Sequence, residues 1–113
     1  MFKTTHSVLG TDYEILLGTR EEISLSEENM GECRPYSKKI LVSTEQEDCD
    51  EEELMRRTQE IVAHELFHAY LNEAGIQLEE RDEELLCDFM MKSWRKYNNS
   101  VLSVLEESGF LDN

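Results

Sequence analysis

The sequence predicts an α+β fold in which a small antiparallel sheet packs on two long helices, with a short third helix towards the carboxyl-terminal end. Apolar residues alternate in parts of the first half of the chain and recur at helical spacing in the second half. Strands followed by helices is the order typical of α+β domains. With 113 residues, the chain is long enough for one modest core, so we expect a single domain over residues 1–113.

Two strands are predicted in the first half. Asp12–Leu17 has an apolar residue at every second position, and Lys38–Ser43 is rich in β-branched and aliphatic residues. We expect the second strand to run antiparallel to the first. The acidic segment Arg20–Met30 between them fits either a loop or a short helical turn, and Arg34 should be extended because a proline follows it.

The first helix is predicted over Glu51–Ala74. Asp50 is a suitable N-cap, in an acidic first turn that suits the helix dipole. Gly75 is suited to the left-handed position that ends a helix, after which Ile76 would fold back on Leu71.

The second helix should begin near Asp82, whose side chain can cap it, and run to Tyr97. A short third helix is predicted over Val101–Ser108, with Ser100 as its N-cap and Gly109 just past its end. The apolar stripe of the second helix is expected on Leu85, Phe89 and either Leu86 or Met90.

His64, Glu65 and His68 form an H-E-x-x-H motif inside the first helix. Side chains four residues apart lie on one helix face, so both imidazoles can reach one metal ion. Neutral imidazole is a common zinc ligand, and a neighbouring carboxylate can accept a proton from zinc-bound water. The surrounding run Ile61–Leu71 is otherwise apolar, so these ionisable groups require partners or a metal.

A catalytic zinc usually has three protein ligands, and the best third candidates are carboxylates in the second helix. Glu84 and Asp88 share one face, and antiparallel packing of the two helices would carry Glu84 towards the histidines. Asp88 could then hold a ligand imidazole by accepting its other ring N–H. Glu83, about 100° round the helix from Glu84, and the neighbouring Glu79 and Glu80 remain alternatives.

These residues resemble the gluzincins, the thermolysin-like branch of the zincin metallopeptidases. HELFHAYLNEAG followed by DEELLCD is similar, more narrowly, to small metallopeptidase-like proteins encoded in phages and prophages. The resemblance implies a minimal zincin-like domain in which His64, His68 and Glu84 bind Zn²⁺. It also implies that Glu65 is the general base and that Asp88 supports a ligand imidazole.

The specific part of the resemblance covers residues 64–88, with weaker similarity in residues 9–15 and 31–43. It implies that a strand around Ile40–Ser43 lies beside the active-site cleft and can pair with an extended substrate. The carboxyl-terminal domain that stabilises the oxyanion in large gluzincins has no expected counterpart here. Chemistry alone suggests Tyr36, Tyr70, Arg81 and Tyr97 for that role.

The composition and net charge of the chain argue against several classes of function. The formal net charge of −15 opposes binding to nucleic acid and to anionic membranes, and no apolar run is long enough for a membrane span. The amino terminus lacks the pattern of a signal peptide. Three cysteines without a C-x-x-C pair indicate free thiols in a reducing, cytoplasmic compartment.

We therefore expect a zinc-dependent metallopeptidase, a hydrolase that cleaves a peptide or protein substrate, with basic substrates as the first choice for so acidic a chain. One alternative is a binding module that keeps zinc but does no chemistry. Another is an acidic interaction protein without a metal. Metal content distinguishes the acidic interaction protein from the two zinc-containing alternatives. Hydrolysis that depends on Glu65 distinguishes the metallopeptidase from the binding module.

Overall fold

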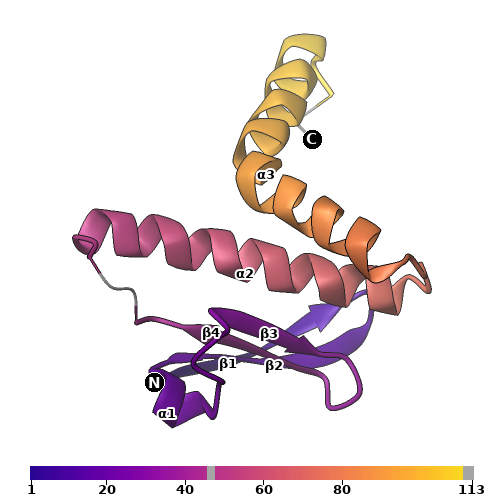
Figure 1. Cartoon of the computed structure of the whole chain (residues 1–113). Helices are drawn as coiled ribbons and strands as arrows, with labels where there is room; N and C mark the ends of the chain where they lie inside the picture. Colours follow the sequence, from indigo (N-terminus) through magenta and orange to yellow (C-terminus); the bar gives the residue numbers. More distant parts are fainter. Residues whose placement is uncertain (46–47, 111–113) are drawn as a thin grey trace.

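A computed structural model describes residues 1–45 and 48–110, and within them the chain forms a four-stranded sheet and three helices (Figure 1). The order of the elements confirms the α+β fold. The strands are β1 (Phe2–Val8), β2 (Thr11–Gly18), β3 (Gly31–Arg34) and β4 (Lys39–Ser43). The helices are α1 (Arg20–Ile23), α2 (Glu51–Glu73) and α3 (Glu80–Ser108).

The sheet is mixed, with the strand order β1-β2-β4-β3. β1 and β3 run antiparallel to their neighbours, but β4 runs parallel to β2. The prediction of a wholly antiparallel sheet was therefore wrong, as was the antiparallel pairing of Lys38–Ser43 with Asp12–Leu17. The cause is the path of the chain. After α1 it runs back along the outer edge as β3, so the turn into β4 places that strand beside β2 in the same direction.

The amino-terminal strand β1 was not predicted from the sequence. It forms a hairpin with β2 through Leu9 and Gly10, whose φ angles of 50° and 89° suit a tight hairpin turn. Val8 is the one buried residue of this strand. Since the other residues of β1 are exposed, the strand lacks the alternation of apolar and polar residues that would reveal it.

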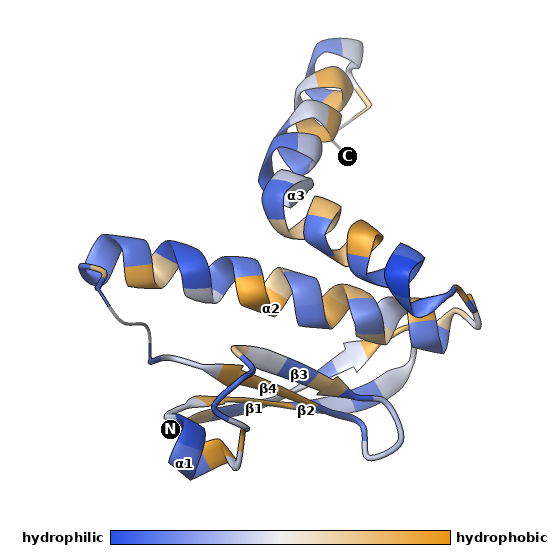
Figure 2. Ribbon diagram, in the orientation of Figure 1, coloured by the Kyte–Doolittle hydropathy of each residue, from blue (hydrophilic) through white to orange (hydrophobic). Residues whose placement is uncertain are grey.

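The core lies between the sheet and α2, which crosses one face of the sheet (Figures 1 and 2). Alternation along β4 sends Ile40 and Val42 to this face and Leu41 to the other. There Leu41 packs with Ile23, the last residue of α1, and with Leu25 just after the helix. The buried residues on the α2 side are Val8, Tyr13, Ile15, Ile40, Val42, Ile61 and Ala69.

The predicted bounds of the first helix are confirmed to within a residue. Asp50 is the N-cap, and its carboxylate accepts a hydrogen bond from the Glu53 backbone N–H at 2.8 Å. Gly75 is left-handed, with a φ of 72°. The Ile76 N–H donates to the Leu71 carbonyl at 3.0 Å, which closes the helix as expected.

The second and third predicted helices are one continuous helix, α3, so Ser100 is an interior residue and not an N-cap. The helix also starts earlier than predicted, with Glu79 as N-cap in place of Asp82, and Glu79 makes no side-chain capping bond. Its end is as predicted, with Gly109 at a φ of 79° and the Phe110 N–H donating to the Leu105 carbonyl at 3.1 Å.

The face of α3 that packs on α2 also differs from the prediction. Leu85 and Phe89 are 69% and 64% exposed, whereas Cys87 is fully buried and Met90 is half-buried. The acidic residues on either side of Cys87 interact with α2, and this orientation of the helix turns Leu85 and Phe89 towards solvent.

Polar and apolar residues are mixed along the whole length of α2 and α3 (Figure 2). Accordingly, no helix in the described part of the chain combines the length and the apolar character needed to span a membrane.

Candidate metal centre

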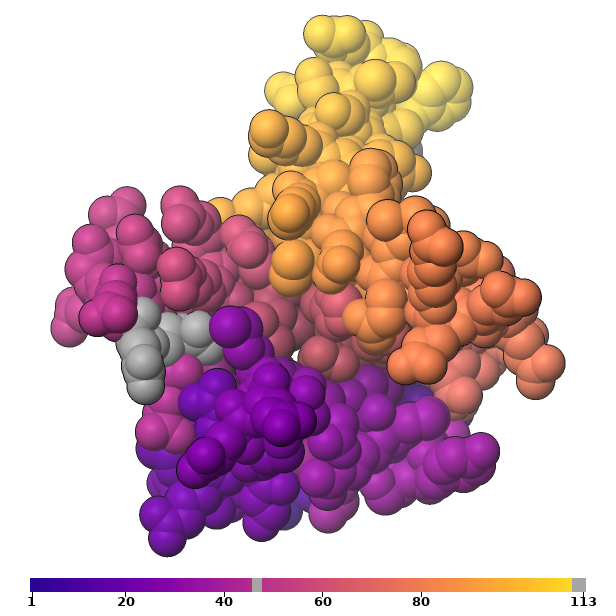
Figure 3. Space-filling model, viewed as in Figure 1, coloured from indigo at the N-terminus to yellow at the C-terminus, as the bar shows by residue number. Residues whose placement is uncertain are grey.

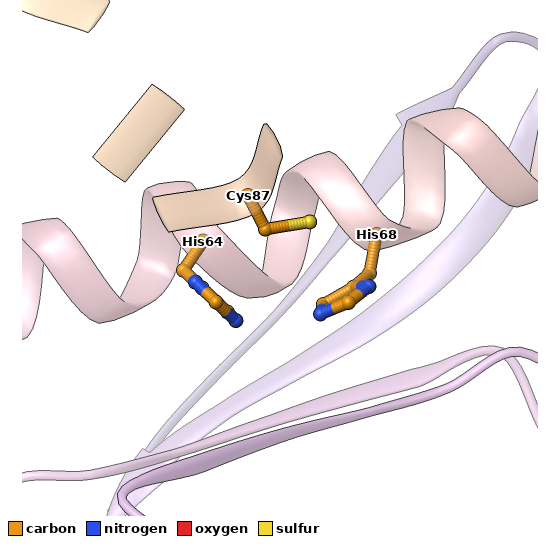
Figure 4. A group of neighbouring side chains, drawn as sticks. All are labelled: His64, His68 and Cys87. Atoms are coloured by element: carbon orange, nitrogen blue, oxygen red, sulfur yellow. The ribbon is translucent and has the colours of Figure 1, made fainter. Parts of the chain in front are cut away.

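His64 and His68 lie one turn apart on α2, on the side that faces α3. Their ring centroids are 5.0 Å apart, and their side chains are only 13% and 14% exposed. Both imidazoles project the same way from the helix (Figure 4). The i, i+4 spacing therefore places two nitrogen donors side by side in a nearly buried position, as the motif predicts.

Glu84 contacts both imidazoles from the first turns of α3. One of its oxygens lies 3.3 Å from Nε2 of His64, and the other lies 2.8 Å from Nε2 of His68. The antiparallel course of the two helices brings it there, since α3 approaches earlier residues of α2 as it proceeds. The structure thus brings together the three residues predicted as ligands.

The other ring nitrogens face a second pair of carboxylates. Asp88 Oδ1 lies 3.1 Å from Nδ1 of His64, at the position predicted for it. Glu83 Oε2 lies 2.5 Å from Nδ1 of His68, a contact that was not predicted. On the sequence alone, Glu83 is only an alternative metal ligand. Spacing along the second helix does not show which of its carboxylates will lie beside the outer nitrogens of the histidines in the first helix.

These contacts fit a divalent cation between the Nε2 atoms and Glu84. When the Glu83 and Asp88 carboxylates each accept a hydrogen bond from Nδ1, the Nε2 atoms of both imidazoles are left as acceptors. The Nε2 lone pairs would then face the Glu84 carboxylate, and a cation between them would relieve this unfavourable contact. Imidazole and carboxylate ligands of this kind suit zinc.

Glu65 lies next to the pair of histidines and is buried. Its Oε2 is 4.0 Å from Nε2 of His64. Burial raises the pKa of Glu65 to about 7, and nearby Glu84 and Glu32 add to the rise. His68 opposes the rise, as does a hydrogen bond from the Cys33 backbone N–H. The result is a carboxyl group that titrates near neutral pH, as a general base requires.

Strand β3 closes over Glu65 because Gly31 has no side chain. A Cβ atom on Gly31 would lie 2.6 Å from Cγ2 of Ile61 and 3.1 Å from Oε2 of Glu65. Both distances are shorter than ordinary van der Waals contacts, so only glycine allows this approach. Gly31 thereby places the backbone of β3 against the candidate base.

The site opens into a groove of about 840 Å³ between β3, α2 and the start of α3. Its walls include Gly31, Glu32 and Cys33 from β3, and Glu80 from α3. The strand beside the cleft is therefore β3. The expectation that Ile40–Ser43 would pair with a substrate was wrong, because β4 lies between β2 and β3 and both of its edges are already paired.

Cys87 offers a competing ligand. Donor atoms of His64, His68 and Cys87 (Figure 4) lie within 4.8 Å of one another. The same is true of donor atoms of His64, Glu84 and Asp88. Burial and the surrounding carboxylates raise the pKa of the Cys87 thiol to about 12 when no metal is bound. We prefer Glu84 as the third ligand because it contacts both imidazoles and needs no deprotonation of a thiol.

The four residues suggested for stabilising an oxyanion are not among those that line the groove. Tyr36 and Tyr97 are exposed, Arg81 lies on the outside of α3, and Tyr70 packs against the core. The described residues therefore supply the candidate ligands and base but none of the suggested oxyanion donors.

Comparisons with known proteins found no match. No protein-family model, curated protein or solved structure proved significantly similar to this chain. The resemblance of residues 64–88 to the gluzincins accordingly stays a prediction from the motif, and the function has to be argued from the geometry of the site.

Proposed function

We propose that the chain is a zinc-dependent metallopeptidase of the gluzincin type. One observation carries the proposal: Nε2 of His64 and Nε2 of His68 both face the Glu84 carboxylate, and Glu65 lies beside them. Asp88 and Glu83 hold the outer ring nitrogens and orient the imidazoles, as carboxylates commonly do around zinc-binding histidines.

When bound, zinc would supply a Lewis acid that polarises a carbonyl group and makes water more acidic. The protein's own contribution is Glu65, which accepts a proton from the attacking water and later delivers it to the leaving amine. Burial and the Cys33 N–H fix the position of its carboxylate beside the two histidines.

The substrate we propose is an extended peptide segment bound along β3. This strand is the last in the sheet, so its outer edge offers backbone groups for pairing with a further strand. Glu32 and Glu80 line the groove, which favours basic side chains in the substrate. The net charge of −15 supports the same preference and disfavours nucleic acid or membrane partners.

We place this activity in the cytoplasm and regard a phage or prophage origin as the best match to the sequence. Two features support the setting. Cys33 and Cys87 form no disulfide in the part of the chain that the structure describes, and the sequence of residues 64–88 resembles that of small phage-encoded proteins.

A second candidate function is a zinc-containing binding module without catalysis. It is favoured by one observation, that Tyr36, Tyr70, Arg81 and Tyr97 do not line the groove. Without an oxyanion donor, the site would lose a contribution that is typically about 10²–10³ in turnover.

Zinc content and Glu65→Gln together test the proposal. Purified protein should hold one zinc ion per chain, and Glu65→Gln should keep it, because this residue is not a ligand. Peptide hydrolysis should fall by at least about 10²–10⁴-fold in the variant, since the proton acceptor is removed while the shape is retained. Metal analysis and a peptide library rich in lysine and arginine provide the two measurements.

Each outcome identifies a different function. Protein without zinc, or His68→Ala that retains full zinc, would contradict the metal site. Tight zinc binding with no cleavage across the library would favour the binding module. Equal hydrolysis by wild type and Glu65→Gln would reveal a contaminating protease.

A further inference from the structure

An apolar seam runs along nearly the whole of α3. Its members are spaced alternately three and four residues apart, which is the repeat that forms a continuous stripe between paired helices. They are Cys87, Met90, Trp94, Tyr97, Val101 and Val104.

Only the first half of this seam is covered by the protein's own fold. Cys87 is fully buried against α2, and Met90 and Trp94 are half-buried. Arg95 still contacts α2, through a hydrogen bond from its guanidinium to Gln59. Beyond this point α3 projects from the body of the molecule (Figures 1 and 3).

The second half of the seam is exposed. Tyr97 is 68%, Val101 38% and Val104 63% exposed, in line with the covered residues before them. The helix bends where it leaves the body (Figure 1). There the Ser93 hydroxyl donates to the Phe89 carbonyl one turn back, a bond that often bends helices. An amphipathic helix in this position is stable when its apolar stripe is covered.

The charges along α3 indicate which partner covers the exposed half of the seam. Between Asp88 and Glu106 the sequence has no carboxylate, although acidic residues outnumber basic ones by 26 to 11 in the chain as a whole. The same segment carries Lys92, Arg95 and Lys96, and it is followed directly by Glu106 and Glu107. The helix is therefore basic at one end of the exposed half and acidic at the other.

We propose that two copies of the chain associate by packing the exposed halves of α3 against each other in antiparallel orientation. Tyr97, Val101 and Val104 of each copy form the apolar contact. Antiparallel packing sets the basic end of one helix beside the acidic end of the other, whereas parallel packing would bring like charges together. It also places the two bodies at opposite ends of the helix pair.

Sedimentation of the full chain over a concentration series from roughly micromolar to millimolar tests the association, because this range brackets small interfaces. We expect a reversible monomer–dimer equilibrium. Val101→Asp should raise the dissociation constant at least about tenfold, since a charge in a desolvated apolar contact costs that much or more. Leu102→Asp is the matched control, because Leu102 is 42% exposed and lies about 100° round the helix from Val101.

Charge reversal tests the orientation. Lys96→Glu should weaken the dimer a few-fold, as expected for exposed ion pairs. Combining it with Lys92→Glu, Glu106→Lys and Glu107→Lys in the same chain exchanges the charges of the two ends and should restore the association. A monomer throughout the concentration series would overturn the proposal, as would equal effects of Val101→Asp and Leu102→Asp. Failure of the combined variant to recover would overturn the antiparallel arrangement. None of these measurements depends on metal binding or peptidase activity.

Discussion

At the scale of single residues, the candidate centre uses both nitrogens of each imidazole. The Nε2 atoms of His64 and His68 face Glu84, and the Nδ1 atoms face Asp88 and Glu83. Each carboxylate therefore has its own task, set by the nitrogen that it faces. This division of roles makes the neighbouring glutamates distinguishable by mutation, although their chemistry is the same.

Glu84→Ala should reduce zinc affinity far more than Glu80→Ala does. Both residues lie in the first turns of α3 and both line the groove, but only Glu84 contacts the imidazoles. We expect a loss of more than about 100-fold for Glu84→Ala. Glu83→Gln and Asp88→Asn should each lose about 10- to 100-fold, as for other groups that orient zinc ligands.

Competition with a chromophoric chelator measures these affinities. The ranking is contradicted if Glu83→Ala weakens zinc binding more than Glu84→Ala, because Glu83 would then be the ligand.

A separate cluster away from the metal centre should make stability depend on pH. Glu73 near the end of α2 accepts hydrogen bonds from Lys38 and Tyr13, and these lower its pKa from the ordinary 4.5 to about 2. A depressed pKa in the folded state adds stability above the unfolded value of 4.5, and this stability is lost as the pH falls through about 2.

Glu73→Gln should therefore destabilise the protein at pH 7, and the difference from wild type should shrink steadily below about pH 4.5. Urea unfolding at a series of pH values measures it. Glu60→Gln is the control on the same helix, where the Glu60 carboxylate forms an i, i+4 pair with Arg56. A difference between Glu73→Gln and wild type that does not change between pH 7 and pH 2 would show that the carboxylate is not the cause.

At the scale of elements, the sequence allowed α2 to be predicted almost completely but not the sheet. α2 carries its own signals, a capping aspartate at Asp50 and a left-handed glycine at Gly75. The direction of β4 depends on the route taken by residues 20–30, and no local pattern encodes that route. β1 was missed because its pairing with β2 buries almost nothing, so its sequence carries no alternation.

The same difference between local signals and tertiary packing explains which parts of the candidate site could be predicted. Spacing put Glu84 and Asp88 on one helix face but left Glu79, Glu80 and Glu83 as alternatives, and only the resemblance to the gluzincins singled out Glu84. The packing face of α3 could not be placed. Leu85 and Phe89 look like core residues in the sequence, and only the contact with α2 shows that the acidic residues and Cys87 take that face.

Ser100→Ala tests whether α3 is continuous. Alanine in a helix interior is better than serine by about 0.5 kcal/mol, so the variant should gain helicity if Ser100 is interior. If Ser100 capped a separate helix, its replacement would cost about 1 kcal/mol and helicity would fall. Far-ultraviolet circular dichroism during thermal unfolding distinguishes the two signs, and Ser103→Ala, three residues further along the same helix, provides the reference for an interior serine.

At the scale of the whole molecule, the centre joins the two long helices at a point of concentrated negative charge. Four carboxylates surround the two histidines: Glu65, Glu83, Glu84 and Asp88. They contribute four of the negative charges in a chain whose net charge is −15. Repulsion between these carboxylates therefore disfavours the packing of α3 on α2 unless a cation lies between the helices.

Removal of the metal should consequently lower the melting temperature. Binding to the folded state alone contributes about 2.7 kcal/mol when free zinc is 100 times its dissociation constant, which corresponds to a shift of roughly 10 °C or more in a domain of this size. Calorimetry before and after chelation measures the shift. Glu84→Gln is the control, because it should already melt near the metal-free temperature and respond little to chelator.

The salt dependence of the melting temperature distinguishes relief of carboxylate repulsion from the stabilisation that zinc gives simply by binding to the folded state. In the metal-free protein the carboxylates repel one another across the α2–α3 contact, and added salt screens exposed charges over a few ångströms at about 1 M. Salt should therefore raise the melting temperature of the metal-free protein more than that of the zinc-bound protein. An identical salt response in both forms would mean that the carboxylates are not held together by the metal. An unchanged melting curve after complete removal of zinc would place the metal outside the α2–α3 contact altogether.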